Sequence, residues 1–71
     1  MDLTPEEQAI LEGYAAGLTD EEVAAACGLS PEAVRAHLTT IQQKLGAHSK
    51  LEAVLIALKA GLIAGPGSPH S

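Results

Sequence analysis

Four side chains within nine residues could contact the edges of nucleic-acid bases: Arg35, Ala36, Thr39 and Gln43. At 100° per residue, a helix over 31–45 places Ala36, Thr39 and Gln43 on one side and Arg35 beside them. This side is short and polar and carries no large apolar group. Guanidinium, hydroxyl and amide groups hydrogen-bond to base edges, so the surface suits insertion into the major groove of DNA. We therefore predict that these four residues contact bases.

A second set of polar residues follows along the same helix and just beyond it. Hydroxyl, ammonium and imidazole groups donate hydrogen bonds to phosphate oxygens and so hold a protein against the duplex. We predict phosphate contacts from Thr40, Lys44, His48 and Lys50. His37 has two interpretations, a partly buried polar anchor or a further phosphate donor.

The acidic residues near this surface also allow two interpretations each. Glu32 could accept a hydrogen bond from a cytosine amino group and contribute specificity. It could instead only stabilise the start of its helix, where the dipole favours negative charge. The cluster of Asp20, Glu21 and Glu22 is either a set of capping residues on a solvated face or a contact surface for a basic partner, such as a polymerase subunit.

The helices that must position these residues are marked in the sequence by an N-cap Ser or Thr (here called the opener) and by a Gly at the C-terminal end. Ser and Thr accept a backbone N–H at a helix N-terminus, and Gly adopts the left-handed conformation that ends a helix. The pairs are Thr4 with Gly17, Thr19 with Gly28, Ser30 with Gly46, and Ser49 with Gly61. They predict an all-α, compact four-helix domain with helices at about 5–16, 20–27, 31–45 and 50–60.

Further local signals support these boundaries. Glu7, Glu22 and Glu52 stand three residues after an opener, which is the spacing of a capping box. The second and third helices are separated only by residues 27–29. A short turn that contains Gly between two helices is typical of a helix-turn-helix.

Helical spacing also predicts which faces are buried. Val34, Leu38, Ile41 and Leu45 form one apolar stripe, whereas Glu6, Glu7 and Glu12 fall on the outer side of the first helix. The last helix is apolar on nearly every side, so one face should pack inward and a second should meet a partner. We predict a dimer interface there; the alternative is a helix sunk deeper in the core. The predicted interface residues are Leu51, Val54, Leu55, Leu58 and Leu62.

Composition restricts the class of protein. Seventy-one residues allow one domain, which we expect over 1–63, followed by a flexible C-terminal tail at 64–71. Tyr14 is the only aromatic residue, so the core must consist of Leu, Ile, Val and Ala. The net charge is −5, but seven of nine acidic residues precede residue 23 and every Lys and Arg lies at 35 or later. For nucleic-acid binding this distribution matters more than the total.

Several functions are excluded by residues that the chain lacks. The single cysteine, Cys27, cannot form an internal disulfide, which favours the cytoplasm, and the scattered histidines give no metal site. No nucleophile–base pair, paired carboxylate or phosphate-binding loop indicates an enzyme or a cofactor. The apolar stretch at 51–63 is too short to span a bilayer.

Three segments resemble the LuxR-type (GerE-like) helix-turn-helix domain of bacterial transcription regulators. They read LTPEE at 3–7, GLTDEEVA at 17–24 and LSPEAVRAHLTTIQQKLGAHSKLEAV at 29–54. The resemblance implies a third helix in the DNA major groove and dimers through the fourth helix on repeated sites. Arg35, Lys44 and Lys50 match basic positions of the family.

The chain also departs from the family pattern. Ala33 stands where a Thr commonly contacts phosphate, and Glu32 stands where a basic or neutral residue is usual. Thr39, Thr40 and Gln43 replace residues that are frequently basic or Asn. Fewer phosphate contacts predict weak DNA binding by an isolated domain, or binding that needs a dimer or partner.

Two functions therefore compete. The first is sequence-specific binding of double-stranded DNA by a homodimer that regulates transcription. The second is an acidic protein-interaction module on a helix-turn-helix scaffold, which binds RNA polymerase or another regulator with little DNA binding of its own.

Overall fold

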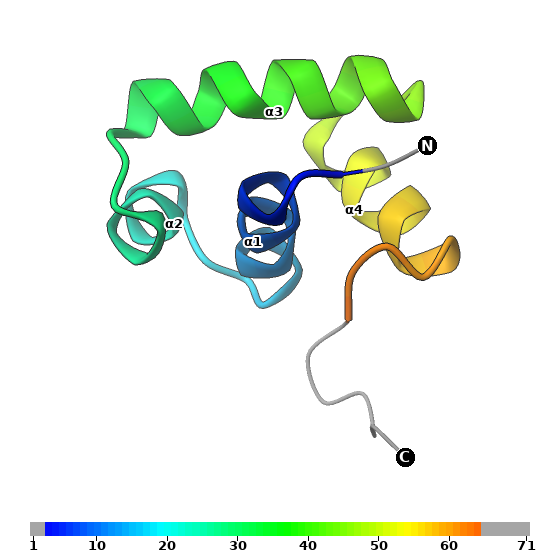
Figure 1. Cartoon of the computed structure of the whole chain (residues 1–71), viewed down its shortest axis with the longest axis horizontal. Coiled ribbons are helices and arrows are strands. Elements are labelled where there is room, and N and C mark those ends of the chain that lie inside the picture. The colour runs from blue at the N-terminus through cyan, green and yellow to red at the C-terminus, as the bar shows by residue number, and fades with distance from the viewer. Residues whose placement is uncertain (1–2, 65–71) are drawn as a thin grey trace.

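The computed structural model describes residues 3–64, and within that range the secondary structure is entirely helical. The predicted all-α class is confirmed, although Ala16 and Ala60 cap the first and last helices instead of extending them. Of the tail expected at 64–71, residues 65–71 lie outside the described residues. The helices are α1 (Pro5–Ala15), α2 (Asp20–Cys27), α3 (Pro31–Leu45) and α4 (Lys50–Lys59) (Figure 1).

Every helix begins at the predicted Ser or Thr, whose side chain accepts the backbone N–H three residues on. The capping boxes predicted for α1 and α2 are present. The one predicted for α4 is wrong, because Glu52 Oε1 accepts from the backbone N–H of His48 at 2.6 Å. Ser49 has an extended backbone (φ −155°), whereas Thr4 has φ −70°, so a different N–H faces the carboxylate.

The turn between α2 and α3 depends on a left-handed glycine. Gly28 has φ 70° and ψ 31°, and its N–H donates to the carbonyls of Ala24 and Ala25. The next residue, Leu29, donates to the carbonyl of Ala24 at 2.9 Å, which closes the end of α2. A Cβ at Gly28 would meet no atom within 4 Å. The position therefore requires glycine for its backbone conformation and not for space.

The three other helices lie on one side of α3, as Figure 1 shows. Val34, Ile41 and Leu45 of α3 are buried against this side. They meet a core that includes Ile10 and Leu11 of α1, both fully buried. No described helix covers the opposite side of α3.

One face of α4 packs inward and another does not. Ala53 and Ala57 are fully buried, whereas Leu51 and Leu55 are 67% and 46% exposed. Residues beyond the helix return to the core, because Ile63 is buried and Gln8 Nε2 donates to the Leu62 carbonyl at 3.2 Å. The segment after α4 thus holds its C-terminal end against the core, while the helix still presents leucines to solvent.

Neither a membrane-spanning helix nor a metal-binding cluster is found within residues 3–64. None of the helices in this range is long and apolar enough to cross a membrane. The same residues contain no group of His, Cys, Asp and Glu that could hold a metal ion.

Candidate nucleic-acid interface

The uncovered side of α3 carries the residues that helical spacing assigned to it. Arg35, Ala36, Thr39 and Gln43 are all exposed, as is Thr40 beside them. This side lies opposite the buried stripe, because α3 is a regular helix of 15 residues. The surface is therefore accessible along the length of the helix, with the small Ala36 between longer polar groups.

The two threonines of this face have their hydroxyl protons engaged. Thr39 Oγ1 donates to the Arg35 carbonyl at 3.2 Å, and Thr40 Oγ1 donates to the Ala36 carbonyl at 3.5 Å. A hydroxyl that donates its one proton still accepts through its lone pairs. Thr39 consequently presents an acceptor and a methyl group to the outside, which are groups that meet an amino group or a thymine methyl.

Arg35 is paired with an acidic residue from α2. Its Nη1 lies 3.6 Å from Asp20 Oδ2, and the Arg35 and Asp20 side chains are 53% and 32% exposed. The other carboxylate oxygen of Asp20 accepts a hydrogen bond from the Tyr14 hydroxyl at 2.5 Å. That hydrogen bond, aided by Lys50 and Arg35 against the opposing effect of burial, lowers the pKa of Asp20. The Asp20 carboxylate is therefore a fixed negative charge beside Arg35.

Tyr14 joins a second basic residue, Lys50, to this group. Lys50 Nζ lies 4.5 Å from the centroid of the Tyr14 ring, within the range of a cation–π contact. Burial, and then the Asp20 carboxylate, raise the pKa of Tyr14, so its hydroxyl remains a donor. Lys50 is exposed and has no described ion-pair partner, so its ammonium can turn toward a phosphate.

Lys44 occupies a different position from the one its sequence pattern suggests. Its Nζ lies 2.8 Å from Glu7 Oε1, and the Glu7 side chain is only 5% exposed. Glu7 was expected on the outside of the first helix, but it is buried between α1 and α3. Burial alone would raise the pKa of Glu7, but hydrogen bonds from Lys44 and Thr4 and the charge of Lys44 outweigh it and lower that pKa.

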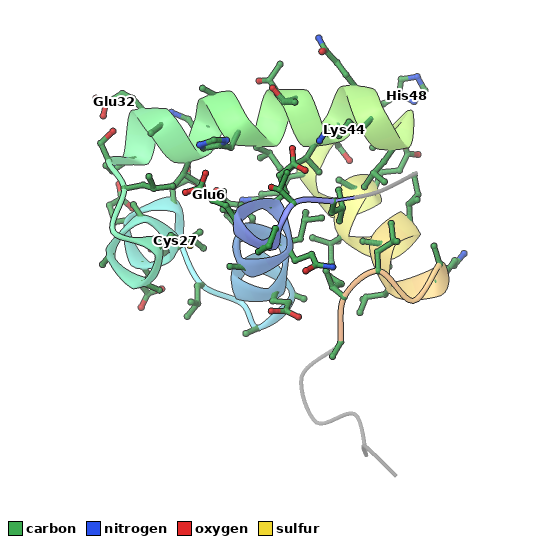
Figure 2. The ribbon with its side chains drawn as sticks, in the orientation of Figure 1. Glu6, Cys27, Glu32, Lys44 and His48 are labelled. Atoms are coloured by element: carbon green, nitrogen blue, oxygen red, sulfur yellow. The ribbon has the colours of Figure 1, made fainter. Side chains whose placement is uncertain are left out.

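The predicted phosphate contact of Lys44 stays a prediction, and Glu7 competes with it. Figure 2 shows Lys44 turned from α3 toward α1, while Glu32 and His48 lie near opposite ends of α3. A lysine that neutralises a buried carboxylate cannot leave it without a large loss of stability. Lys44 holds α3 against α1, so a phosphate would have to compete with Glu7 for its ammonium group.

The histidines and Glu32 lie at the margins of the face. His48 is 92% exposed, and its Nδ1 lies 3.3 Å from Glu52. His37 is 37% exposed, and its Nε2 lies 3.1 Å from Glu6, which favours the polar anchor among its two interpretations. Glu32 is exposed in the first turn of α3, which is compatible with both of its interpretations.

The predicted dimer residues divide between surface and core. Leu51 and Leu55 are exposed on α4, and Leu58 and Leu62 are half-buried. Val54 is only 7% exposed and belongs to the core, so the structure removes it from the predicted interface. Because α4 is apolar on nearly every side, the sequence pattern could not separate its inner from its outer face.

Sequence reasoning also missed Glu7, Tyr14 and Asp20 as parts of this site. Glu7 and Lys44 are 37 residues apart, and no local pattern brings them together. Tyr14 and Asp20 lie on separate helices with a glycine turn between them. A polar side chain on an otherwise apolar stripe, Tyr14, is the one signal that could have suggested a buried hydrogen bond.

The fold and this surface together define a class of protein. Two helices meet at a short glycine turn, and the second of them presents an uncovered polar face flanked by basic residues. This is the arrangement of a helix-turn-helix domain.

Comparison with known proteins identifies the family within this class. Residues 1–57 match the GerE family, described as bacterial regulatory proteins of the luxR family. The chain belongs to this family, as the resemblance implied. The family is one of regulators, which agrees with the expectation that the chain is not an enzyme.

Curated relatives are similar over most of this chain. The transcriptional regulatory protein YdfI of Bacillus subtilis (strain 168) is 41% identical over 61 residues, which are 86% of this chain and 29% of YdfI. The transcriptional regulatory protein ComA of the same strain is 43% identical over 61 residues, which are 28% of ComA. The chain thus spans under a third of the length of these relatives.

Solved structures confirm the fold. The transcription factor GerE superposes with a TM-score of 0.83 at 26% identity, and the match covers 87% of this chain and 92% of GerE. The Vibrio cholerae VqmA dimer, solved without its target DNA, gives a TM-score of 0.80 at 26% identity over 89% of this chain and 29% of VqmA.

Proposed function

We propose that this domain binds double-stranded DNA sequence-specifically as a homodimer and regulates transcription. In this proposal α3 enters the major groove and α4 forms the dimer interface. The observation that carries the proposal is the uncovered face of α3, where Arg35, Thr39 and Gln43 are exposed and no described helix stands before them. Because bacterial DNA lies in the cytoplasm, the proposal implies that compartment.

The roles within the site follow from exposure and partners. Arg35, Ala36, Thr39 and Gln43 are proposed to contact base edges, and Thr40, His48 and Lys50 to contact phosphates. For that contact the Thr40 hydroxyl must turn its proton from the Ala36 carbonyl to the phosphate oxygen. The guanidinium and amide can make bidentate hydrogen bonds to guanine and adenine, respectively. Lys50 is the cation that can reach a phosphate most easily, because it is exposed and is held only by a cation–π contact with Tyr14 and by attraction to the Asp20 carboxylate.

The dimer is proposed to form through the exposed leucines of α4. Leu51 and Leu55 are one turn apart on the same side of the helix, and Leu58 follows on that side, whereas Leu62 lies in the segment beyond the end of α4. Large apolar side chains at such exposure are removed from water when two copies meet. The similarity to a protein described as a dimer, VqmA, supports this arrangement.

The names of similar proteins support DNA as the partner. YdfI and ComA are transcriptional regulatory proteins, and the VqmA structure refers to a target DNA. VqmA shares the fold of this chain over the matching part, and YdfI and ComA match this chain in sequence over 61 residues. From the activities of these relatives we propose only one for this chain, namely regulation through DNA.

Binding to random duplex DNA across a salt series tests the proposal. With Lys44 engaged by Glu7, each protomer has at most Arg35 and Lys50 for phosphates. About four contacts per dimer give a slope of log affinity against log salt no steeper than about −3.6. Arg35→Glu should abolish detectable binding, whereas Lys59→Glu, an equal charge change at the far end of α4, should retain most of it.

A second function is favoured by one observation. The acidic Asp20 neutralises Arg35, and Glu32 is exposed on the same helix, so the face has little net positive charge. A protein-interaction module that binds RNA polymerase or another regulator would have this property. Absence of DNA binding at the lowest salt, by a folded wild-type domain at high concentration, would favour this module and refute DNA binding.

A further inference from the structure

The ion pair between α2 and α3 involves the one arginine of the candidate interface. Arg35 Nη1 approaches Asp20 at 3.6 Å through a single nitrogen, which leaves the remaining N–H groups of the guanidinium without a described partner. A guanidinium has five N–H donors in a planar fork. Its outer edge can therefore still reach a bidentate acceptor while Nη1 stays beside the carboxylate.

The carboxylate is the fixed member of this pair. Asp20 Oδ1 is held by the Tyr14 hydroxyl at 2.5 Å, and the residue occupies the first position of α2, where the helix dipole favours its charge. Tyr14 itself is only 9% exposed and cannot turn outward. Asp20 therefore restrains Arg35, and Arg35 does not restrain Asp20.

A fixed negative charge affects the two kinds of DNA contact differently. A phosphate that approached Arg35 would compete with the carboxylate for the same cation and would be repelled by it. A base edge is uncharged, so it accepts from the guanidinium without this repulsion. A neighbouring carboxylate should thus disfavour phosphate contacts by Arg35 and favour base contacts.

We infer that Asp20 is a specificity-determining residue, which positions Arg35 for a guanine in the major groove and suppresses its contacts with phosphates. The inference rests on the proposed DNA-binding function and deepens it. Guanine is the base assigned, because its O6 and N7 atoms accept both N–H groups of one guanidinium edge.

The test compares Asp20→Asn with the wild type on two duplexes, one selected by the wild type from random DNA and one of random sequence. Asn retains an oxygen that can accept from Tyr14, so the fold should persist, and its thermal unfolding checks this. Affinity for random DNA should rise about threefold per protomer, or about tenfold per dimer, because one exposed competing ion pair is removed. The salt slope should become steeper by about 0.9 for each Arg35 released.

Affinity for the selected duplex should change less than twofold, so that the ratio of specific to random affinity falls about tenfold. A selection repeated with Asp20→Asn should show a weaker preference for guanine at the position that Arg35→Gln also loses. A role in stability alone would change neither this ratio nor the salt slope.

Glu21→Gln is the matched control. Glu21 is exposed, lies in the same first turn of α2, loses the same charge and has no described ion pair. Its effect on random DNA should be well below that of Asp20→Asn. In an Arg35→Gln background most of the difference between the two substitutions should disappear, and the attraction between Asp20 and Lys50 accounts for the remainder.

The outcomes separate the two proposals. If the wild type binds DNA and Asp20→Asn has the same specificity ratio and salt slope as Glu21→Gln, the role of Asp20 is overturned and DNA binding stands. If neither the wild type nor Asp20→Asn binds either duplex at low salt, both proposals are overturned.

Discussion

Lys44→Met should destabilise the domain by removing the charge that neutralises Glu7. The Glu7 side chain is 5% exposed, and its partner, Lys44, is 36% exposed. Loss of one member of a fully buried pair costs about 3–5 kcal/mol, and the partial exposure of Lys44 reduces our expectation to about 2 kcal/mol. For a domain of this size that loss lowers the midpoint of thermal unfolding by ~10 °C. Circular dichroism with heat and with urea measures both quantities.

The pH dependence gives this prediction its sign. The pKa of Glu7 is lowered in the folded state, so the stabilisation is complete above its ordinary value of 4.5 and is lost as the pH falls through the folded value. The cost of Lys44→Met should accordingly be largest near neutral pH and shrink in acid, where the carboxyl becomes neutral. A cost that does not change with pH would mean that packing is lost and not the ion pair.

Two controls isolate the pair. Lys59→Met removes an exposed lysine from the last turn of α4 and should cost little. In a Glu7→Gln background, where Gln can still accept from the Thr4 N–H, Lys44→Met should cost about 1.5 kcal/mol less than in the wild type. Equal costs of Lys44→Met in the two backgrounds, or a cost no larger than that of Lys59→Met, would refute the reasoning.

Five further substitutions test other parts of the structure. Tyr14→Phe removes a hydrogen bond to a carboxylate, which should cost about 1 kcal/mol in urea unfolding; by NMR titration it should raise the pKa of Asp20, because that bond is the main cause of its lowered value. Leu55→Glu should give a folded monomer by light scattering, because the side chain is 46% exposed, whereas Val54→Glu, at 7% exposed, should unfold the domain. Gly28→Ala should cost about 1 kcal/mol in urea, and Gly28→Asn less, because φ is 70° and the added atoms meet nothing.

The fold was predictable because its determinants are local. The N-cap Ser or Thr of each helix and the Gly that follows its C-terminal end lie within one helix length of each other. A short stretch of sequence therefore contains the signals for both ends of the helix. The error at α4 has the same origin. Ser49 and Glu52 have the spacing of a capping box, but the backbone of Ser49 is extended and the carboxylate binds the N–H of His48. Spacing identifies the residues of a cap, and the backbone decides which N–H they meet.

The site was predictable only where a single helix determines it. The periodicity of α3 gives its outer face, and Arg35, Thr39 and Gln43 are exposed as that periodicity requires. It does not give the partners of those residues, because Asp20 and Glu7 come from other helices. Periodicity also fails to separate the buried face from the exposed face of a helix that is apolar on most sides. Val54 of α4, predicted at the surface, is buried for this reason.

The burial of the paired carboxylate decides which basic side chains of this acidic domain are available for the proposed contacts with DNA. Arg35 is paired with a carboxylate that is 32% exposed, and exposed pairs contribute about 0–1 kcal/mol, so a base edge or phosphate can compete for it. Lys44 is paired with a carboxylate that is 5% exposed, and a phosphate would have to leave that charge buried and alone. Arg35, Lys44 and Lys50 look equivalent in the sequence, but they therefore differ in how readily they can contact DNA. The free cations of one protomer are too few for tight binding, which makes pairing through α4 a requirement of the proposed function and not an accessory to it.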